Sequence, residues 1–451
     1  MSATDLSISD AGRALREGRL TARALLEAHL TRIDRLEPQV RAFVHLDRNV
    51  SLAAADIADS ETAGGRYRGP LHGIPFAVKD LIDVALMPTR CGSRAQQANV
   101  PRTSAAIVDL LVAAGAVPLG KVATYEYALT GPSFDGANPP ARNPWNVAHV
   151  TGGSSSGSAA AVAAGLVRFA IGTDTGGSVR SPAAYCGVVG LKPTRGQLPL
   201  DGVFPLSPSL DHVGIICASV ADAAIVQSIL APASNANTAL DAGARDLSVG
   251  YARGWFAEDP AVSPAVVELM DDAVAVLSML GARISMVALP DYSLAEAAGA
   301  VLIHAEALEV HREVLGPHWA DYGRQARQSL SAGIALSPTD VARARSHALR
   351  FADEVDALLS AHDVIVMPTT LTTAPPLSVS ENEESVWTPM RTLPFNLTGH
   401  PAMSVPMGFA GGLPLGLQII GRKGCEVMVC RVGAAFEAAT DHAAQRPYLP
   451  D

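Results

Sequence analysis

No stretch of the chain holds about 18 consecutive apolar residues, the length at which a helix can cross a bilayer. Residues 1–20 also lack the apolar segment of a secretory signal. We therefore expect neither a membrane span nor an export signal. The cysteines are odd in number and scattered, without a CxxC pair, which favours reduced thiols in a cytoplasmic protein: Cys91, Cys186, Cys217, Cys425 and Cys430.

Blocks of like charge are missing as well. The net charge of −10 argues against a nucleic-acid surface, so we expect no nucleic-acid partner. Internal repeats and low-complexity tracts are absent. A hydrophobic fraction of 48% with 17% charged residues indicates a globular protein with a large core. The length of 451 residues exceeds that of a usual domain, although large α/β enzymes can remain one unit.

Helical and strand patterns alternate along the chain. Residues 104–115 have a helical pattern, and 116–121 follow as a strand. Residues 294–361 are expected to be mostly helical. Further strands are expected at 76–79, 247–251, 282–287 and 363–368, and at 396–408 and 413–421 around a Gly411-Gly412 turn. This alternation predicts an α/β fold.

Two glycine-serine clusters, at 152–157 and 174–180, flank a small, alanine-rich helical stretch. Glycine takes backbone conformations that are closed to other residues and lets another group approach closely. Serines in two such clusters, joined by one helix, can be brought face to face. This arrangement can build a nucleophile.

A serine nucleophile needs a base to take its proton, and the usual histidine is missing. None of the twelve histidines lies between 151 and 194, and the G-x-S-x-G elbow is absent around Ser178. A lysine that burial keeps neutral is the alternative base, and it can act through a second serine. Lys79 at the end of a strand meets this requirement, although a snorkelling lysine is the competing interpretation. Unobstructed backbone N–H groups suggest an oxyanion hole at Thr175, Gly176, Gly177 and Ser178.

The sequence gives less support for a phosphate-binding loop or a metal site. Gly157 is followed by Ser158, so the Gly-Lys-Ser/Thr end of a Walker A loop is absent. Three histidines lie at sevenfold spacing but without a carboxylate at ligand spacing or an HExxH motif, so we expect no metal: His304, His311 and His318. The residues alone leave a serine hydrolase and a nucleotide or anion site open.

Three motifs in fixed order resemble the core of the amidase signature family. They are a Gly-Gly-Ser-Ser-x-Gly cluster at 152–157, a Gly-Thr-Asp-x-Gly-Gly-Ser-x-Arg motif at 172–180, and a Cys-Gly-x-x-Gly-Leu-Lys-Pro-Thr run at 186–194. Residues 73–80 resemble the family's lysine motif, and 396–402 and 412–418 also fit. The resemblance therefore covers nearly the whole chain.

The resemblance implies a role for each matching residue. Ser178 matches the nucleophile that is acylated, Ser154 matches a bridging serine on a cis peptide, and Lys79 matches the base. Supporting roles fall to Ser155, Asp174 and Arg180. The implied fold is a single domain over 1–451 with a mixed, mostly parallel sheet that helices cover on both faces. The catalytic core would span about 70–215, and a helical excursion at about 294–361 would shape the pocket.

The implied reaction is hydrolysis of a small carboxylic amide to an acid plus ammonia or an amine, through an acyl-enzyme on Ser178. The resemblance implies no metal and no organic cofactor. It allows a homodimer, which no pattern in the chain derives. We expect the pocket to be formed by the 130–135 loop, with Thr130, Gly131 and Ser133, and by helical residues between 302 and 348, with His304, Trp319, Tyr322 and Leu336.

The family divides into the glutaminase subunits of glutamyl-tRNA(Gln)/aspartyl-tRNA(Asn) amidotransferases and free-standing amidases, which include allophanate and biuret-type hydrolases. Residues 121–132 differ from the Met-Gly-Ser-Ser-Thr-Glu-Asn-type segment of the glutaminase subunits. Cys425 stands where an aspartate for glutamine's amino group is expected, and Ala348 aligns with an arginine for its carboxylate. A site built for a charged substrate loses heavily without its charge partners. We therefore expect a free-standing amidase, with a glutaminase subunit or an allophanate/biuret-type hydrolase as the alternative.

Overall fold

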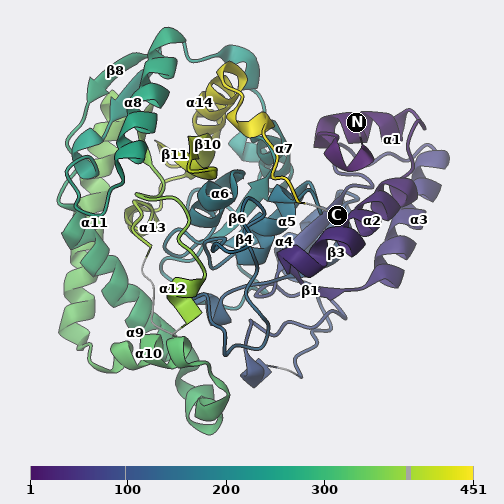
Figure 1. The fold of residues 1–451 in the computed structure, drawn as a ribbon, viewed down its shortest axis with the longest axis horizontal. Coiled ribbons are helices and arrows are strands. Elements are labelled where there is room, and N and C mark those ends of the chain that lie inside the picture. Colours follow the sequence, from purple (N-terminus) through teal and green to yellow (C-terminus); the bar gives the residue numbers. More distant parts are fainter. Residues whose placement is uncertain (1, 97, 382–387, 450–451) are drawn as a thin grey trace.

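An eleven-stranded mixed sheet runs through the computed structural model, which describes residues 2–96, 98–381 and 388–449 (Figure 1). The strands follow one another across the sheet in the order β1-β3-β2-β4-β6-β5-β10-β11-β9-β7-β8. Their bounds are β1 Phe43–Leu46, β2 Pro75–Lys79, β3 Val117–Val122, β4 Phe169–Thr173, β5 Val189–Lys192, β6 Val213–Cys217, β7 Ser248–Tyr251, β8 Arg283–Met286, β9 Val364–Pro368, β10 Ala402–Ala410 and β11 Leu413–Gly421.

Helices flank this sheet, as the sequence predicts for an α/β fold. Figure 1 shows α1 to α3 at one end of the molecule, α8 to α11 at the other, and α5 and α6 between them. The bounds are α1 Ile8–Arg16, α2 Ala22–Val40, α3 Arg48–Ala63, α4 Ala106–Ala113, α5 Ser156–Ala163, α6 Arg180–Cys186, α7 Val220–Leu230, α8 Pro264–Met279, α9 Tyr292–His318, α10 Arg324–Ile334, α11 Pro338–Ala361, α12 Ser378–Glu381, α13 Pro394–Thr398 and α14 Glu426–Ala439.

The single α/β domain and the mixed sheet confirm the predicted fold class, but the expectation that most strands are parallel is wrong. Of the neighbouring strand pairs described, four are parallel, namely β2–β3, β2–β4, β7–β8 and β7–β9, and six are antiparallel. A parallel pair needs a long crossover, whereas an antiparallel pair can be joined by a hairpin. In the centre β6 returns between β4 and β5, and Gly411 and Gly412, both with positive φ, close the β10–β11 hairpin.

Two predicted boundaries shift in the structure. The strand expected from 396 begins only at Ala402, because α13 occupies Pro394–Thr398. Pro394 suits the first turn of a helix, and Gly399 ends it in the left-handed conformation with a φ of 75°. The predicted helical region at 294–361 is formed by α9, α10 and α11. Its assignment as an excursion from a catalytic core at 70–215 stays a prediction.

Helix α5 is buried on every side, which explains its composition of Ser, Gly, Ala and Val. A Cβ atom on Gly157 would lie 2.3 Å from the Ala123 nitrogen and 2.4 Å from the Ala42 oxygen. Only glycine therefore lets α5 pack directly on the chain that leaves β3. This contact fixes the N-terminal end of α5, where the first serine cluster lies.

Among the described helices, none combines the length and apolar character that crossing a membrane requires. All five cysteines are free thiols. The cytoplasmic location and the homodimer stay predictions.

Candidate active site

Strands β2 and β4 bring the predicted base to the serines. They pair in parallel, with Val78 opposite Ile171, so Lys79 and Thr173 both end their strands at the same edge of the sheet. The Lys79 Nζ atom lies 2.8 Å from Ser154 Oγ and 2.7 Å from Thr173 Oγ1. The Lys79 side chain is fully buried, so it does not snorkel to water.

Burial lowers the pKa of Lys79 to about 7, while the Asp174 and Asp211 carboxylates act in the opposite direction. A large fraction of Lys79 is therefore neutral near pH 7. A neutral Nζ atom has a lone pair that can accept the Ser154 proton. The sequence analysis did not predict the contact between Thr173 and Lys79. The position of Thr173 at the end of a short apolar run could have indicated a polar residue at the same sheet edge as Lys79.

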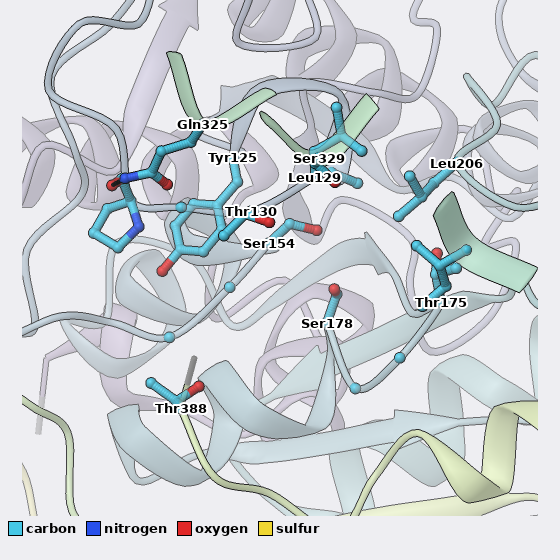
Figure 2. A pocket seen from close by; sticks show the side chains of 18 of the residues that line it. Tyr125, Leu129, Thr130, Ser154, Thr175, Ser178, Leu206, Gln325, Ser329 and Thr388 are labelled. Atoms are coloured by element: carbon cyan, nitrogen blue, oxygen red, sulfur yellow. Dashed lines mark hydrogen bonds between the residues drawn. The ribbon is translucent and has the colours of Figure 1, made fainter. Parts of the chain in front are cut away.

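Backbone contacts hold the two serine clusters together. The peptide between Gly153 and Ser154 is cis. The Ser155 amide donates a hydrogen bond to the Ser178 carbonyl at 3.1 Å, and the Ser155 hydroxyl donates to the Thr173 carbonyl at 3.2 Å. Figure 2 shows the hydroxyl groups of Ser154 and Ser178 in the same cavity. The serines that the sequence predicts to face each other are thus brought together.

The loop after β4 presents Ser178 just before α6, and its shape depends on Gly177. This glycine has a φ of 127°, and a Cβ atom on it would lie 2.1 Å from the Thr392 hydroxyl oxygen. The Thr392 hydroxyl in turn donates a hydrogen bond of 2.6 Å to the Gly176 carbonyl. A side chain at 177 would therefore displace the loop that carries Ser178.

One member of the predicted oxyanion hole has another partner. The Gly177 amide donates a hydrogen bond of 2.9 Å to Asp174 Oδ1, so it is not free to bind an oxyanion. Within the described chain, the amides of Thr175, Gly176 and Ser178 have no hydrogen-bond partner. We therefore correct the predicted set of donors to these three.

Asp174 and Arg180 form a fully buried ion pair beneath the loop, with an Nη2–Oδ1 distance of 2.8 Å and an Nε–Oδ2 distance of 3.0 Å. Arg180 also donates hydrogen bonds to the Thr392 carbonyl, Gln418 Oε1 and Asn396 Oδ1. Burial alone would raise the pKa of Asp174, but the charge and hydrogen bonds of Arg180 outweigh it and hold that pKa well below its usual range. Asp174 therefore stays an anion that accepts hydrogen bonds from amides of the loop.

A cavity of about 370 Å³ opens above the two serines (Figure 2). In Figure 2, Tyr125, Thr130 and Gln325 lie on one side of the serines and Thr175 and Leu206 on the other. None of the described lining residues is Asp, Glu, Lys or Arg. Most of the wall is apolar, and its polar side chains include Tyr125, His304, Gln325, Gln328 and Ser329.

The predicted pocket residues fall into two groups. Thr130, Gly131 and His304 line the cavity. The other four lie outside the described lining: Ser133, Trp319, Tyr322 and Leu336. Ser133 turns away because its hydroxyl donates to Asp135, and Tyr322 is buried against other aromatic rings. Trp319, Tyr322 and Leu336 lie in the connections on either side of α10 rather than within α9 or α10, and the sequence pattern does not indicate which way these connections face.

The three histidines at sevenfold spacing have separate partners. His304 Nδ1 lies 3.2 Å from the Ser329 hydroxyl, His311 Nδ1 lies 2.9 Å from the Tyr322 hydroxyl, and His318 contacts Asp321. They do not converge on one point that a metal ion would occupy.

The two positions interpreted from the sequence as lost glutamine contacts are not in the described cavity wall. Cys425 is the N-cap of α14, and Ala348 of α11 is partly buried against the hydrophobic core. The identity of these two residues therefore says nothing about substrate charge. The observation that does bear on substrate charge is that the described lining of the cavity holds no Asp, Glu, Lys or Arg.

Comparisons with known proteins identify the family of the chain. The Amidase family profile matches residues 24–430. A glutamyl-tRNA(Gln) amidotransferase subunit of Chloroflexus aggregans is 36% identical over 481 residues, with 98% of each chain covered. The peptide amidase of Stenotrophomonas maltophilia has a TM-score of 0.86 at 33% identity, with 98% of each chain covered. A chain from a vestigial protein complex that bears on the origins of an s-triazine catabolic enzyme has a TM-score of 0.90 at 29% identity, covering 96% of this chain and 98% of that one. The protein is thus an enzyme of the Amidase family.

Proposed function

We propose that this enzyme hydrolyses the C–N bond of a small, uncharged carboxylic amide through an acyl-enzyme on Ser178. The observation that carries the proposal is the contact of buried Lys79 with Ser154 at a cavity whose described lining holds no charged side chain. The products are a carboxylic acid and ammonia or an amine.

The proposed reaction begins with neutral Lys79, which takes the proton of Ser154 while Ser154 takes the proton of Ser178. The Ser178 oxygen attacks the amide carbonyl and forms a tetrahedral oxyanion. The amides of Thr175, Gly176 and Ser178 donate hydrogen bonds to that oxyanion, which is the usual way to stabilise this charge.

Collapse of the intermediate breaks the C–N bond. The proton held by Lys79 returns through Ser154 to the leaving nitrogen, which departs as ammonia or an amine. Water then attacks the acyl-enzyme, and its proton follows the same relay until the acid leaves and Ser178 is restored. The Asp174–Arg180 pair and Ser155 hold the loop in place throughout.

The described lining of the cavity supports an uncharged substrate, because a charge buried without a partner is costly. Burial also lowers the pKa of His304, a polar residue of the wall, so its imidazole is neutral at pH 7. An aliphatic, aryl or ureido amide can bury its apolar part against the cavity wall and find hydrogen bonds at the polar side chains.

A glutaminase subunit of a tRNA-dependent amidotransferase is the second candidate, and the sequence comparison favours it, because the Chloroflexus aggregans relative belongs to such an amidotransferase. Glutamine carries an α-ammonium and an α-carboxylate group. Under this alternative, both charges need partners beyond the described lining of the cavity.

The test measures ammonia or amine release by the purified chain alone from aliphatic, aryl and ureido amides and from L-glutamine. Ser178→Ala and Lys79→Ala are compared with Cys425→Ala, a matched substitution outside the cavity. The proposal expects turnover of an uncharged amide that the first two variants abolish and the third retains. Turnover of glutamine alone would favour the glutaminase alternative. Activity that survives Ser178→Ala would refute the mechanism.

A further inference from the structure

A second carboxylate, Asp211, contacts the loop at 174–178 that carries the predicted oxyanion donors, here called the oxyanion loop. Asp211 lies outside the three family motifs. It is 8% exposed and sits at the end of the loop that joins β5 to β6. Its Oδ1 atom accepts a hydrogen bond of 2.6 Å from the Thr175 hydroxyl. The amides of Leu206 and Ser207 donate to the same carboxylate at 2.9 and 3.1 Å. Asp211 therefore joins the oxyanion loop to the Leu206 wall of the cavity.

Asp211 also acts on Lys79. Three groups favour the charged form of Lys79, namely Asp174, Asp211 and Cys91. Asp174 is already paired with Arg180, whereas no arginine or lysine bonds to Asp211 within the described residues. Two further titratable groups lie near this loop. Glu306 of α9 accepts a hydrogen bond of 2.7 Å from the Ser207 hydroxyl, and burial lowers the pKa of His212, which follows Asp211 in the chain.

Burial raises the pKa of Asp211 to about 6, and its hydrogen bonds and the charge of Lys79 oppose the rise. Asp211 is thus mostly an anion at pH 7. A buried anion whose donors are a hydroxyl and two loop amides leaves part of its field uncompensated. That field acts on Lys79, whose Nζ atom contacts the Thr173 hydroxyl two residues before Thr175 and becomes a cation each time it takes the serine proton.

On the basis of the proposed function, we propose that Asp211 is a positioning residue of the active site with two effects. It orients Thr175, and with it the Thr175 and Gly176 amides, through the Thr175 hydroxyl. It also stabilises the ammonium that Lys79 forms during acylation. The two effects can be separated, because the first depends on a hydroxyl group and the second on a charge.

Four variants separate them: Asp211→Asn, Thr175→Val, Thr175→Ser and Ser207→Ala. Each is assayed on one uncharged amide for kcat, KM and the pH profile of kcat/KM, and its folding is checked by thermal unfolding. Ser207→Ala is the matched control, because it removes a hydroxyl of the same loop that bonds Glu306 rather than Thr175.

We expect Asp211→Asn to lower kcat about tenfold or more with little change in KM, because a weaker base and a misplaced donor both slow the chemical step. Loss of the Asp211 charge lowers the pKa of Lys79, so the acid limb of the pH profile of kcat/KM moves to lower pH by about half a unit or more. Thr175→Val lowers kcat by about tenfold without moving the limb. Thr175→Ser restores kcat, and Ser207→Ala leaves the limb in place.

If the acid limb of Asp211→Asn lies at the same pH as that of the wild type, the charge effect is refuted. If Thr175→Val has the kcat of the wild type, the orienting effect is refuted. A purely structural role would lower the unfolding temperature without moving the limb. Both failures differ from failure of the proposed function, in which Ser178→Ala itself stays active.

Discussion

The Lys79 Nζ atom lies 2.8 Å from the Ser154 hydroxyl oxygen, and no carboxylate is bonded to it within the described chain. The neighbouring strand provides a contrast. Lys121 of β3 is equally buried, but its Nζ atom lies 3.2 Å from Asp80 Oδ1. Two buried lysines on adjacent strands thus have different partners. Both contact hydroxyl groups, but only Lys121 also contacts a carboxylate, and the charge of Asp80 opposes the lowering of the Lys121 pKa that burial causes.

This contrast predicts the pH dependence of the enzyme. The proposed mechanism requires neutral Lys79, and burial lowers the pKa of that lysine to about 7. The value of kcat/KM for an uncharged amide should therefore rise with pH up to about 7 and then level off. Measuring kcat/KM for such a substrate over a series of pH values tests this prediction. An acid limb near pH 4, or a rate that still rises at pH 10, would show that another group is the base.

The two lysines should also differ in their effect on stability. Lys121→Met leaves Asp80 buried without its partner and should cost about 3–5 kcal/mol of the free energy of unfolding. Lys79→Met removes a poorly compensated buried amine, so it should abolish turnover without loss of stability. Urea unfolding of both variants measures the difference, and equal destabilisation would contradict the assignment.

The stability gain from Lys79→Met should depend on pH. The pKa of Lys79 is lower in the folded chain than its ordinary value of 10.5, so the unfolded chain binds more protons between about pH 7 and 10.5. The penalty for burying Lys79 is then full below pH 7 and fades as the pH rises. Unfolding curves at pH 7 and pH 10 should show a larger advantage of Lys79→Met at pH 7. A larger advantage at pH 10 would contradict this.

The cavity wall formed by α9 and α10 depends on a close helix contact at Gly333. A Cβ atom there would lie 2.4 Å from the His304 carbonyl oxygen, so Gly333→Ala must push α10 away from α9. We expect a loss of about 1–3 kcal/mol in stability and a raised KM, because the displaced helix carries Gln325, Gln328 and Ser329.

Gly316→Ala in α9 is the matched control, because a Cβ atom at 316 meets nothing within 4 Å. Alanine suits a helix better than glycine, so stability should be equal or up to about 1 kcal/mol higher. Steady-state kinetics and thermal unfolding of both variants measure the effects. An unchanged KM in Gly333→Ala would show that the α9–α10 contact does not shape the site.

The sequence predicts the parts of this molecule that depend on local pattern or on motif. The alternation of helices and strands gives the α/β class, and the glycine-serine clusters place Ser154 and Ser178 in one cavity. Local pattern does not predict the strand directions in the centre of the sheet. There β6 lies between β4 and β5, and that position depends on contacts between residues distant in sequence. The same limit applies to Asp211, since only the folded chain brings it to Thr175.

The direction in which a polar group points explains the remaining errors. Gly177 belongs to the predicted oxyanion loop, yet its amide points to Asp174 rather than into the cavity. Ser133 directly follows the lining residues 128–132, yet its hydroxyl faces Asp135. Spacing along the chain places a residue near a site, but the hydrogen bond it makes decides whether it faces a substrate.

The most direct test of the central claim is the mass of the enzyme quenched during turnover of an uncharged ester, which acylates faster than the matching amide. Our account predicts a mass increase equal to the acyl group, mapped to the peptide that contains Ser178 and absent in Ser178→Ala. An adduct on another residue, or turnover by Ser178→Ala, would contradict it.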